Sequence, residues 1–151
     1  MTAIKVAKMN DNSRILIVDD DEVVRRSYLR SLESISCDVE AARDGEEALQ
    51  TMERKPFDVV LLDMRMPGQD GLSVLRTIKQ KWPDSEVVII TGYPTVDSVK
   101  EAVRLGAYDY ITKPVGPQDV INITDGAIVR KRWALRRVPE ELNAAGNCCA
   151  A

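Results

Sequence analysis

Short runs of apolar residues alternate along the chain with longer segments in which apolar residues recur at three- and four-residue steps. The runs are typical of buried strands, and the recurrence is typical of amphipathic helices. We predict strands at residues 14–19, 37–41, 58–62, 86–91 and 107–111. The helical series are Val24, Tyr28, Leu32 and Ile35; Leu72, Leu75, Ile78 and Trp82; Val96, Val99 and Val103; and Val120, Ile123 and Ala127. Residues 46–54 are less periodic, and we also predict them to be helical.

This alternation predicts an α/β fold, with a single doubly wound, five-stranded parallel sheet flanked by five helices. At 151 residues the chain has the length of one domain. We assign residues 1–13 to an N-terminal extension and residues 14–138 to the folded domain. Residues 139–151 are mostly small and polar, and we expect them to form a flexible C-terminal tail.

Composition narrows the location and the chemistry. The N-terminus lacks a signal-peptide core, the apolar runs are too short to cross a bilayer, and the three cysteines show no disulfide or zinc spacing. We therefore expect a cytoplasmic protein without membrane insertion. The chain contains no histidine, which excludes a catalytic pair of histidine with serine or cysteine and a phosphohistidine within this chain. The net charge of −3 provides no broad attraction to nucleic acid.

Polar residues follow four of the predicted strands, at the point where each strand ends. Asp19 and Asp20 follow ILIV, Asp63 follows VVLL, Thr91 follows VVII, and Lys113 follows the last strand. Ligands of an open parallel sheet bind beyond the carboxyl ends of its strands, so we expect these side chains to converge.

Each residue also has an ordinary explanation. Asp21 fits the N-cap of a helix, Asp63 could begin a turn, Thr91 could be a plain strand residue, and Lys113 could be a solvated lysine. Four coincidences at four strand ends are harder to accept than one shared site. We therefore predict a single site.

The residue types define the chemistry of this site. Three converging carboxylates require a cation, and an all-oxygen set of ligands suits Mg²⁺. A lysine and a hydroxyl beside the cation suit a phosphoryl group. A carboxylate can itself attack phosphorus to form an aspartyl phosphate, and Asp63 on a central strand is the candidate nucleophile.

The segments ILIVDDD, VVLLDMRMPGQDG, VVIITGY and AYDYITKP together resemble the receiver domain of two-component response regulators, over residues 14–138. The resemblance implies a flavodoxin-like, chemotaxis-receiver-like sheet of strand order 2-1-3-4-5. It implies that Asp63 accepts a phosphoryl group from a sensor histidine kinase or a histidine phosphotransfer protein. The missing histidine then belongs to the partner, and the chain is a signalling receiver rather than an enzyme, although it assists its own phosphorylation and dephosphorylation.

The resemblance also assigns the metal ligands. Asp19 and Asp20 correspond to the acidic pair that serves Mg²⁺, with Asp20 as the more direct ligand. Asp63 would supply a carboxylate oxygen, and Arg65 would supply its backbone carbonyl.

The remaining assignments concern the phosphoryl group and the response to it. Lys113 resembles the phosphate-binding lysine, with a cis bond to Pro114. Thr91 and Tyr110 resemble the switch hydroxyl and the switch aromatic residue, and Gly92 is small enough to leave the site accessible.

Two side chains are particular to this chain. In the family, the positions of Arg65 and Tyr93 tune how long the aspartyl phosphate survives. Arg65 either reaches the phosphoryl group or hinders the hydrolytic water, or it is simply a solvated side chain; the sequence leaves these alternatives open.

The resemblance implies a two-state switch. Phosphorylation would draw in the Thr91 hydroxyl, Tyr110 would rotate inward, and the fourth helix, fifth strand and fifth helix would present a changed surface to an output partner. A homodimer formed on phosphorylation is a further partner that the resemblance allows. The segment GYPTVDSVKEAVRLGAYDYITKP is most similar to receivers of enhancer-binding transcription activators.

Two other classes lack their motifs. A magnesium-dependent phosphatase of the haloacid dehalogenase type would carry D-x-D-x-T, and a nucleotide-binding domain would carry a glycine-rich phosphate loop; neither is present. A basic run contains Arg130, Lys131, Arg132, Arg136 and Arg137. We interpret it as a solvated helix end or as a junction to a partner rather than as a nucleic-acid contact. We interpret Cys148 and Cys149 as part of the tail.

Overall fold

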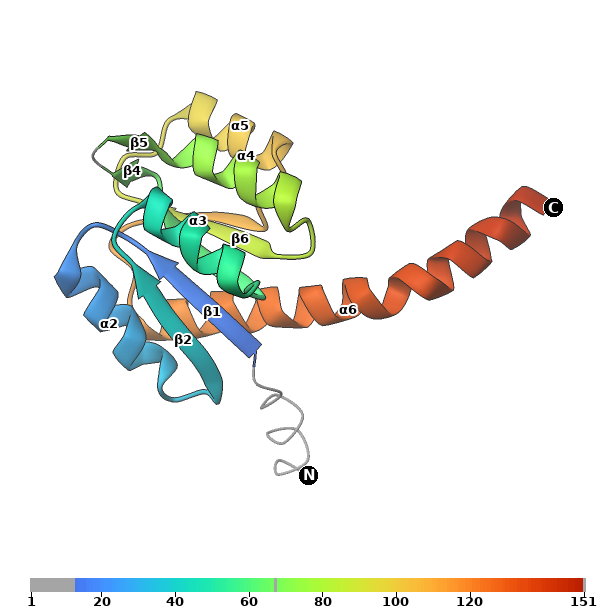
Figure 1. Cartoon of the computed structure of the whole chain (residues 1–151), viewed down its shortest axis with the longest axis horizontal. Coiled ribbons are helices and arrows are strands. Elements are labelled where there is room, and N and C mark those ends of the chain that lie inside the picture. Colours follow the sequence, from blue (N-terminus) through green and yellow to red (C-terminus); the bar gives the residue numbers. More distant parts are fainter. Residues whose placement is uncertain (1–12, 67, 151) are drawn as a thin grey trace.

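A parallel sheet of five strands in the order β2-β1-β3-β6-β7 forms the middle layer of the protein (Figure 1). The computed structural model describes residues 13–66 and 68–150, with side chains described as far as residue 133. Counted along the chain, the strand order is 2-1-3-4-5, which confirms the predicted fold. The strands are β1 (Ser13–Val18), β2 (Cys37–Ala42), β3 (Val59–Asp63), β6 (Glu86–Thr91) and β7 (Asp109–Thr112).

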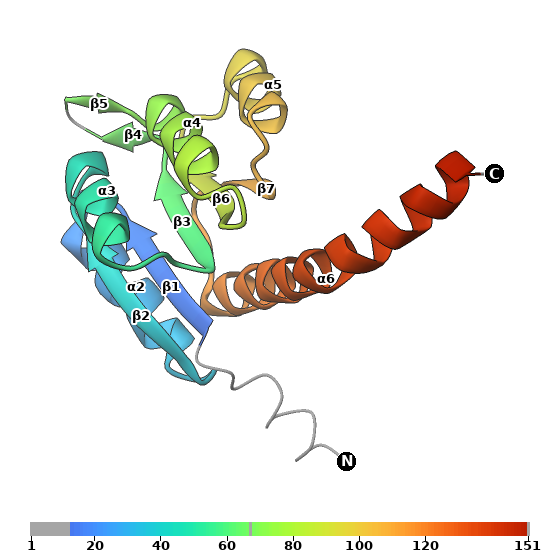
Figure 2. The same cartoon turned by 45° about the vertical axis from the view of Figure 1, so that its right-hand side comes forward.

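Helices cover both faces of the sheet (Figures 1 and 2). One face packs against α2 (Glu22–Leu32) and α6 (Pro117–Ala150), and the other against α3 (Gly45–Arg54), α4 (Gly71–Lys81) and α5 (Val96–Arg104). The less periodic segment at residues 46–54 is therefore helical, as predicted.

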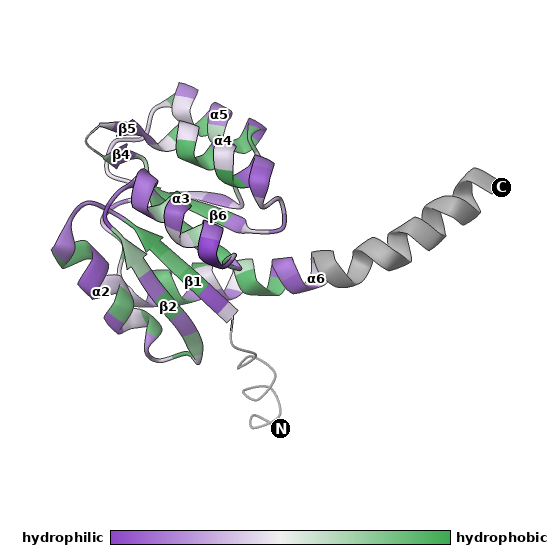
Figure 3. Cartoon of the chain, in the orientation of Figure 1, coloured by the Kyte–Doolittle hydropathy of each residue, from purple (hydrophilic) through white to green (hydrophobic). Residues whose placement is uncertain are grey.

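Alternation along the strands divides the core into two halves. In β1, Leu16 and Val18 face the side of α3 and α4, whereas Ile15 and Ile17 face α2 and α6. Because both faces are covered, β1 is hydrophobic along most of its length, while the edge strand β2 carries hydrophilic positions (Figure 3). This burial explains the continuous apolar runs that identify the central strands in the sequence.

A short antiparallel hairpin follows β3. Its strands, β4 (Arg65–Met66) and β5 (Gln69–Asp70), pair with each other and not with the main sheet. The sequence pattern predicts only a turn here, because strands of two residues are too short to show a period. The hairpin carries Arg65 past the end of β3 and leads into α4, whose N-cap is Asp70.

Helix α6 differs most from prediction. Its backbone is helical to Ala150, past Pro139, where the sequence pattern predicts a flexible tail. Residues 140–145 contain glutamate, leucine and alanine, which are strong helix formers, and this composition explains why the helix continues. The side chains of Arg136, Arg137, Cys148 and Cys149, and the predicted N-terminal extension as far as residue 12, lie outside the described residues.

The first part of the basic run binds the sheet at its amino-terminal edge. Lys131 forms an ion pair with Asp58, and the Arg130 Nε atom lies 3.7 Å from Glu86. Arg132 donates a hydrogen bond to the hydroxyl of Ser13 at 3.3 Å. These contacts tie α6 to the beginnings of three central strands, so this part of the run contacts the protein's own sheet instead of forming a fully solvated helix end.

Among residues 13–66 and 68–150, no helix combines the length and the apolar character that crossing a membrane would require.

Candidate functional site

The carboxyl edge of the sheet brings three carboxylates together. Asp19 follows β1 directly, Asp20 is its neighbour, and Asp63 ends β3, the adjacent strand. Each residue offers an oxygen, and these oxygens all lie within 4.8 Å of one another. Asp19 and Asp63 are buried, whereas Asp20 is exposed. A small divalent cation with oxygen ligands fits this set, because its charge would offset the repulsion among the three groups.

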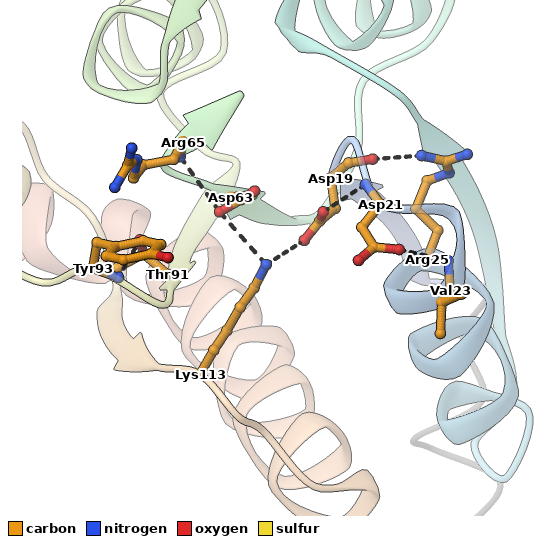
Figure 4. Close-up of polar contacts among 9 residues, drawn as sticks. All are labelled: Asp19, Asp21, Val23, Arg25, Asp63, Arg65, Thr91, Tyr93 and Lys113. Atoms are coloured by element: carbon orange, nitrogen blue, oxygen red, sulfur yellow. Dashed lines mark hydrogen bonds and ion pairs between the residues drawn. The ribbon is translucent and has the colours of Figure 1, made fainter. Parts of the chain in front are cut away.

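Asp21 does not belong to this set. Its carboxylate accepts a hydrogen bond of 2.9 Å from the backbone N–H of Val23, so it is the N-cap of α2, as predicted. Asp19 is held by the same turn, since its Oδ1 atom accepts a hydrogen bond of 2.9 Å from the backbone N–H of Asp21. The adjacent aspartates thus have different structural environments (Figure 4).

Lys113 reaches between the carboxylates from the loop after β7 (Figure 4). Its Nζ atom lies 2.8 Å from Asp19 Oδ2 and 3.7 Å from Asp63 Oδ1. Burial lowers the pKa of Lys113, but the hydrogen bond and charge of Asp19 and the charge of Asp63 outweigh it, so the pKa is raised. The ammonium therefore stays charged at neutral pH. The bond between Lys113 and Pro114 is cis, as expected.

Asp63 is an unusually weak acid for an aspartate. Burial and the charge of Asp19 raise its pKa to about 6, although Lys113 and the backbone N–H of Arg65 act in the opposite direction. At neutral pH the carboxylate is mostly ionised and therefore nucleophilic. Protonation competes with cation binding as the pH falls through this value.

This pKa leads to a stability prediction for the metal-free protein. A raised folded-state pKa favours the folded state at low pH, and that advantage is lost as the pH rises from the ordinary value of 3.8 through about 6. We expect Asp63→Asn to increase the free energy of unfolding by about 1–3 kcal/mol at pH 7.5 in a metal chelator. Urea unfolding at pH 7.5 and pH 4 measures this. If Asp63→Asn increased the free energy of unfolding as much at pH 4 as at pH 7.5, the raised pKa of Asp63 would not be the cause.

Two further side chains stand on the other side of Asp63. The guanidinium of Arg65 lies over the ring of Tyr93, 4.2 Å from its centroid, and Tyr93 is 68% exposed (Figure 4). This stacked pair borders a hollow of about 560 Å³ that Asp20 also lines. Arg65 is thus an exposed side chain that is fixed by an aromatic partner rather than a freely solvated one.

Thr91 and Tyr110, the residues expected to act in a switch, lie in the neighbouring strands β6 and β7. Thr91 is fully buried at the end of β6, and its Oγ1 atom accepts a hydrogen bond of 3.2 Å from the backbone N–H of Tyr93. Tyr110, in β7, is half-buried, and its hydroxyl lies 2.8 Å from the hydroxyl of Ser98 in α5. Ser98 also forms the capping box of α5 with Thr95.

Two residues near the site were not singled out from the sequence. Arg25 donates a hydrogen bond of 2.7 Å to the backbone carbonyl of Asp19, so α2 braces the acidic turn. Tyr28 is buried close enough to the site for the charges of Lys113, Asp19 and Asp63 to influence its phenol, whose pKa burial raises to about 12. The sequence places Tyr28 only on an apolar helical stripe, and nothing in that periodicity indicates the proximity of a site on another strand.

Comparison with known proteins agrees with this geometry. The sequence profile described as "Response regulator receiver domain" matches residues 15–125. The chain is 38% identical to the response regulator protein PilR of Pseudomonas aeruginosa over 102 residues, which cover 68% of this chain and 23% of PilR. It is also 38% identical to the DNA-binding transcriptional regulator NtrC of Klebsiella pneumoniae, over 74% of this chain and 24% of NtrC. The chain thus spans about a quarter of the length of these relatives.

Solved structures show the same fold. The CheY-like receiver domain protein of Methanospirillum hungatei has a TM-score of 0.78 and 30% identity, covering 81% of this chain and 98% of that one. NtrX of Brucella abortus has a TM-score of 0.77 and 30% identity, covering 86% of this chain and 29% of that one.

Proposed function

Because the chain belongs to the response regulator receiver family, we propose that it is a phosphoryl-accepting signalling switch in which Asp63 is the acceptor. The observation that carries the proposal is the position of the buried Asp63 carboxylate, which lies beside both the acidic pair and the Lys113 ammonium. An aspartate in this setting can act as a nucleophile toward phosphorus. Acetyl phosphate tests the proposal, since the wild type should gain one phosphoryl group and Asp63→Asn should gain none.

The transfer needs a donor from outside the chain. A carboxylate oxygen of Asp63 attacks the phosphorus of a phosphohistidine on a sensor histidine kinase or histidine phosphotransfer protein. The P–N bond breaks, its electron pair stays with the imidazole, and the imidazole takes up a proton. Hydrolysis reverses the state when water attacks the phosphorus and the P–O bond breaks, which releases inorganic phosphate and regenerates the Asp63 carboxylate.

Different residues of the site would stabilise different parts of this transfer. Asp19, Asp20 and Asp63, with the backbone carbonyl of Arg65, would hold Mg²⁺. When bound, Mg²⁺ supplies positive charge to neutralise phosphoryl oxygens. Lys113 supplies a second positive charge, and its pKa keeps it protonated. The O–H of Thr91 can donate to a phosphoryl oxygen while its oxygen continues to accept from Tyr93.

The switch would act through contacts that link Thr91 to α5. Movement of Thr91 toward the phosphoryl group would pull on the backbone of Tyr93, two residues before the N-cap of α5. Inward rotation of Tyr110 would break its contact with Ser98. The surface of α5, β7 and α6 would change and address an output partner or a second copy of the chain. Shifting such an equilibrium from 1:99 to 99:1 takes about 5.5 kcal/mol, which several charge-assisted hydrogen bonds of roughly 1.5–3 kcal/mol can supply.

The Arg65–Tyr93 pair is proposed to lengthen the lifetime of the aspartyl phosphate. It borders the hollow beside Asp63, where its two side chains would restrict the approach of water from that side. We expect Arg65→Ala to speed dephosphorylation by roughly 3- to 10-fold, because the guanidinium is lost and Tyr93 loses its stacking partner. The decay of phosphorylated protein after removal of acetyl phosphate measures this. Arg26→Ala, at an exposed arginine on α2, serves as the control, and equal decay of wild type and Arg65→Ala would contradict the role.

The proposed location and partners follow from the same function. A receiver that meets its kinase through phosphohistidine transfer is expected in the cytoplasm. Direct nucleic-acid binding is not expected, because Arg130, Lys131 and Arg132 contact the protein's own sheet. A phosphatase of the haloacid dehalogenase type stays the alternative, and its D-x-D-x-T motif is missing.

A further inference from the structure

Tyr28 lies on the border between the core and the candidate site. Its side chain is only 5% exposed and packs in the half of the core that contains Ile15 and Ile17. Tyr28 and Lys113 also line the same hollow of about 430 Å³, between the start of α2 and the loop after β7. A mostly buried phenol therefore opens onto a space that borders the phosphoryl-binding lysine.

The Tyr28 hydroxyl has unused hydrogen-bonding capacity. Within the part of the chain that the structure describes, it has no hydrogen-bond partner, and it is not among the side-chain atoms that are sealed from solvent. Its oxygen can accept hydrogen bonds, and its O–H can donate one. Since the pKa of this phenol is raised to about 12, it keeps its proton at neutral pH. The hydroxyl is thus a neutral group that can still bind a partner, and it belongs to a residue that lines the hollow.

The Lys113 ammonium has an N–H donor that is not directed to either carboxylate. An ammonium carries three N–H donors, and here it has two carboxylate partners, Asp19 at 2.8 Å and Asp63 at 3.7 Å. Asp19 also belongs to the carboxylate set that would hold a cation, so Lys113 shares this partner. A further neutral anchor would keep the ammonium in place without competing for the cation.

We propose that Tyr28 is a positioning residue for phosphoryl transfer, whose hydroxyl holds the Lys113 ammonium through a water molecule in the shared hollow. The two groups form no direct hydrogen bond, and the hollow has ample room for water. Ser27 lines the same hollow and offers a further polar group. A bridging water is nearly as favourable as a direct hydrogen bond. This inference rests on the proposed function of Asp63.

Two variants that each remove only a hydroxyl test the proposal. Tyr28→Phe keeps the buried ring, and Tyr108→Phe is the matched control, because Tyr108 packs against the same half of the core but precedes β7 at the opposite edge of the sheet. The initial rate of phosphorylation is measured as a function of acetyl phosphate concentration with saturating Mg²⁺. We expect Tyr28→Phe to lower the maximal rate by roughly 3- to 10-fold with little change in the half-saturating concentration. Tyr108→Phe should react at the wild-type rate.

The unfolding midpoint in urea separates positioning from structure. If the role is positional, Tyr28→Phe unfolds at the same urea concentration as the wild type while its rate falls. The inference is overturned if Tyr28→Phe reacts at the wild-type rate, if Tyr108→Phe slows equally, or if the lower rate accompanies a lower unfolding midpoint. If the wild-type protein gains no phosphoryl group, the proposed function itself is wrong. If the wild type and Tyr28→Phe are both phosphorylated normally, only the role of Tyr28 is wrong.

Discussion

Asp20→Asn should weaken Mg²⁺ binding by about 100-fold, or roughly 3 kcal/mol. Asp20 is the exposed member of the three-carboxylate set, so its substitution removes one negative charge and one oxygen ligand with little effect on packing. A hard cation with only oxygen ligands depends strongly on the charge of those ligands. Isothermal titration of the metal-free protein with MgCl₂ gives the dissociation constant directly.

Asp21→Asn is the matched control for this experiment. Asp21 is adjacent in sequence and is also exposed, but its carboxylate caps α2 by accepting from Val23. Asparagine is an equally good N-cap, so both stability and Mg²⁺ affinity should stay within roughly threefold of the wild type. Equal losses in the two variants would show that general negative charge, and not a defined set of ligands, attracts the ion.

Lys113→Met should slow phosphorylation by acetyl phosphate by about 100- to 1,000-fold, because removal of one preorganised charged group costs about this much in transition-state stabilisation. Mg²⁺ binding should be retained or strengthened in the same variant. The Lys113 ammonium lies 2.8 Å from Asp19, so its removal frees that carboxylate and removes a competing positive charge. The rate therefore falls while the Mg²⁺ affinity does not, which a merely unfolded variant could not produce.

Lys79→Met is the control for Lys113→Met. Lys79 is another partly buried lysine, but it donates to the backbone carbonyls of Pro83 and Ser85, away from the site. It should lower stability without changing the phosphorylation rate of the folded protein. If the Lys113→Met protein binds Mg²⁺ and is phosphorylated at the wild-type rate, Lys113 has no role in the phosphoryl transfer.

The sheet and the convergence of the site could be predicted because they depend on simple patterns. The central strands are buried on both faces, so their apolar runs are continuous and their ends are marked by the first polar residue, such as Asp19 or Asp63. In a parallel sheet these ends lie on one edge, so polar residues that are far apart in the sequence come close together in the structure.

Apolar periodicity was a poorer guide to burial in α5. Val96 and Val103 belong to its helical stripe, yet they are 70% and 65% exposed, and Ala102 is the only residue of this helix that is fully buried. Periodicity reports that a segment is helical, but it does not report whether a neighbouring element covers the whole stripe. The exposed valines lie on the surface that the proposed switch would change.

Contacts between distant segments that do not lie at the strand ends could not be predicted. The Arg65–Tyr93 stack depends on a hairpin too short to show a period, and the approach of Tyr28 to Lys113 depends on how α2 packs beside the loop after β7. The contacts of the basic run of α6 likewise depend on the fold, which places Asp58 and Glu86 at the edge of the sheet opposite to the site.

The central claim is that Asp63 carries the phosphoryl group. Wild-type protein and Asp63→Asn are incubated with acetyl phosphate and Mg²⁺, and each intact protein is then weighed by mass spectrometry. We predict that the wild type gains the mass of one phosphoryl group, that the gain disappears when Mg²⁺ is chelated beforehand, and that Asp63→Asn gains none. No gain in the wild type, or an equal gain in Asp63→Asn at another residue, would contradict the account.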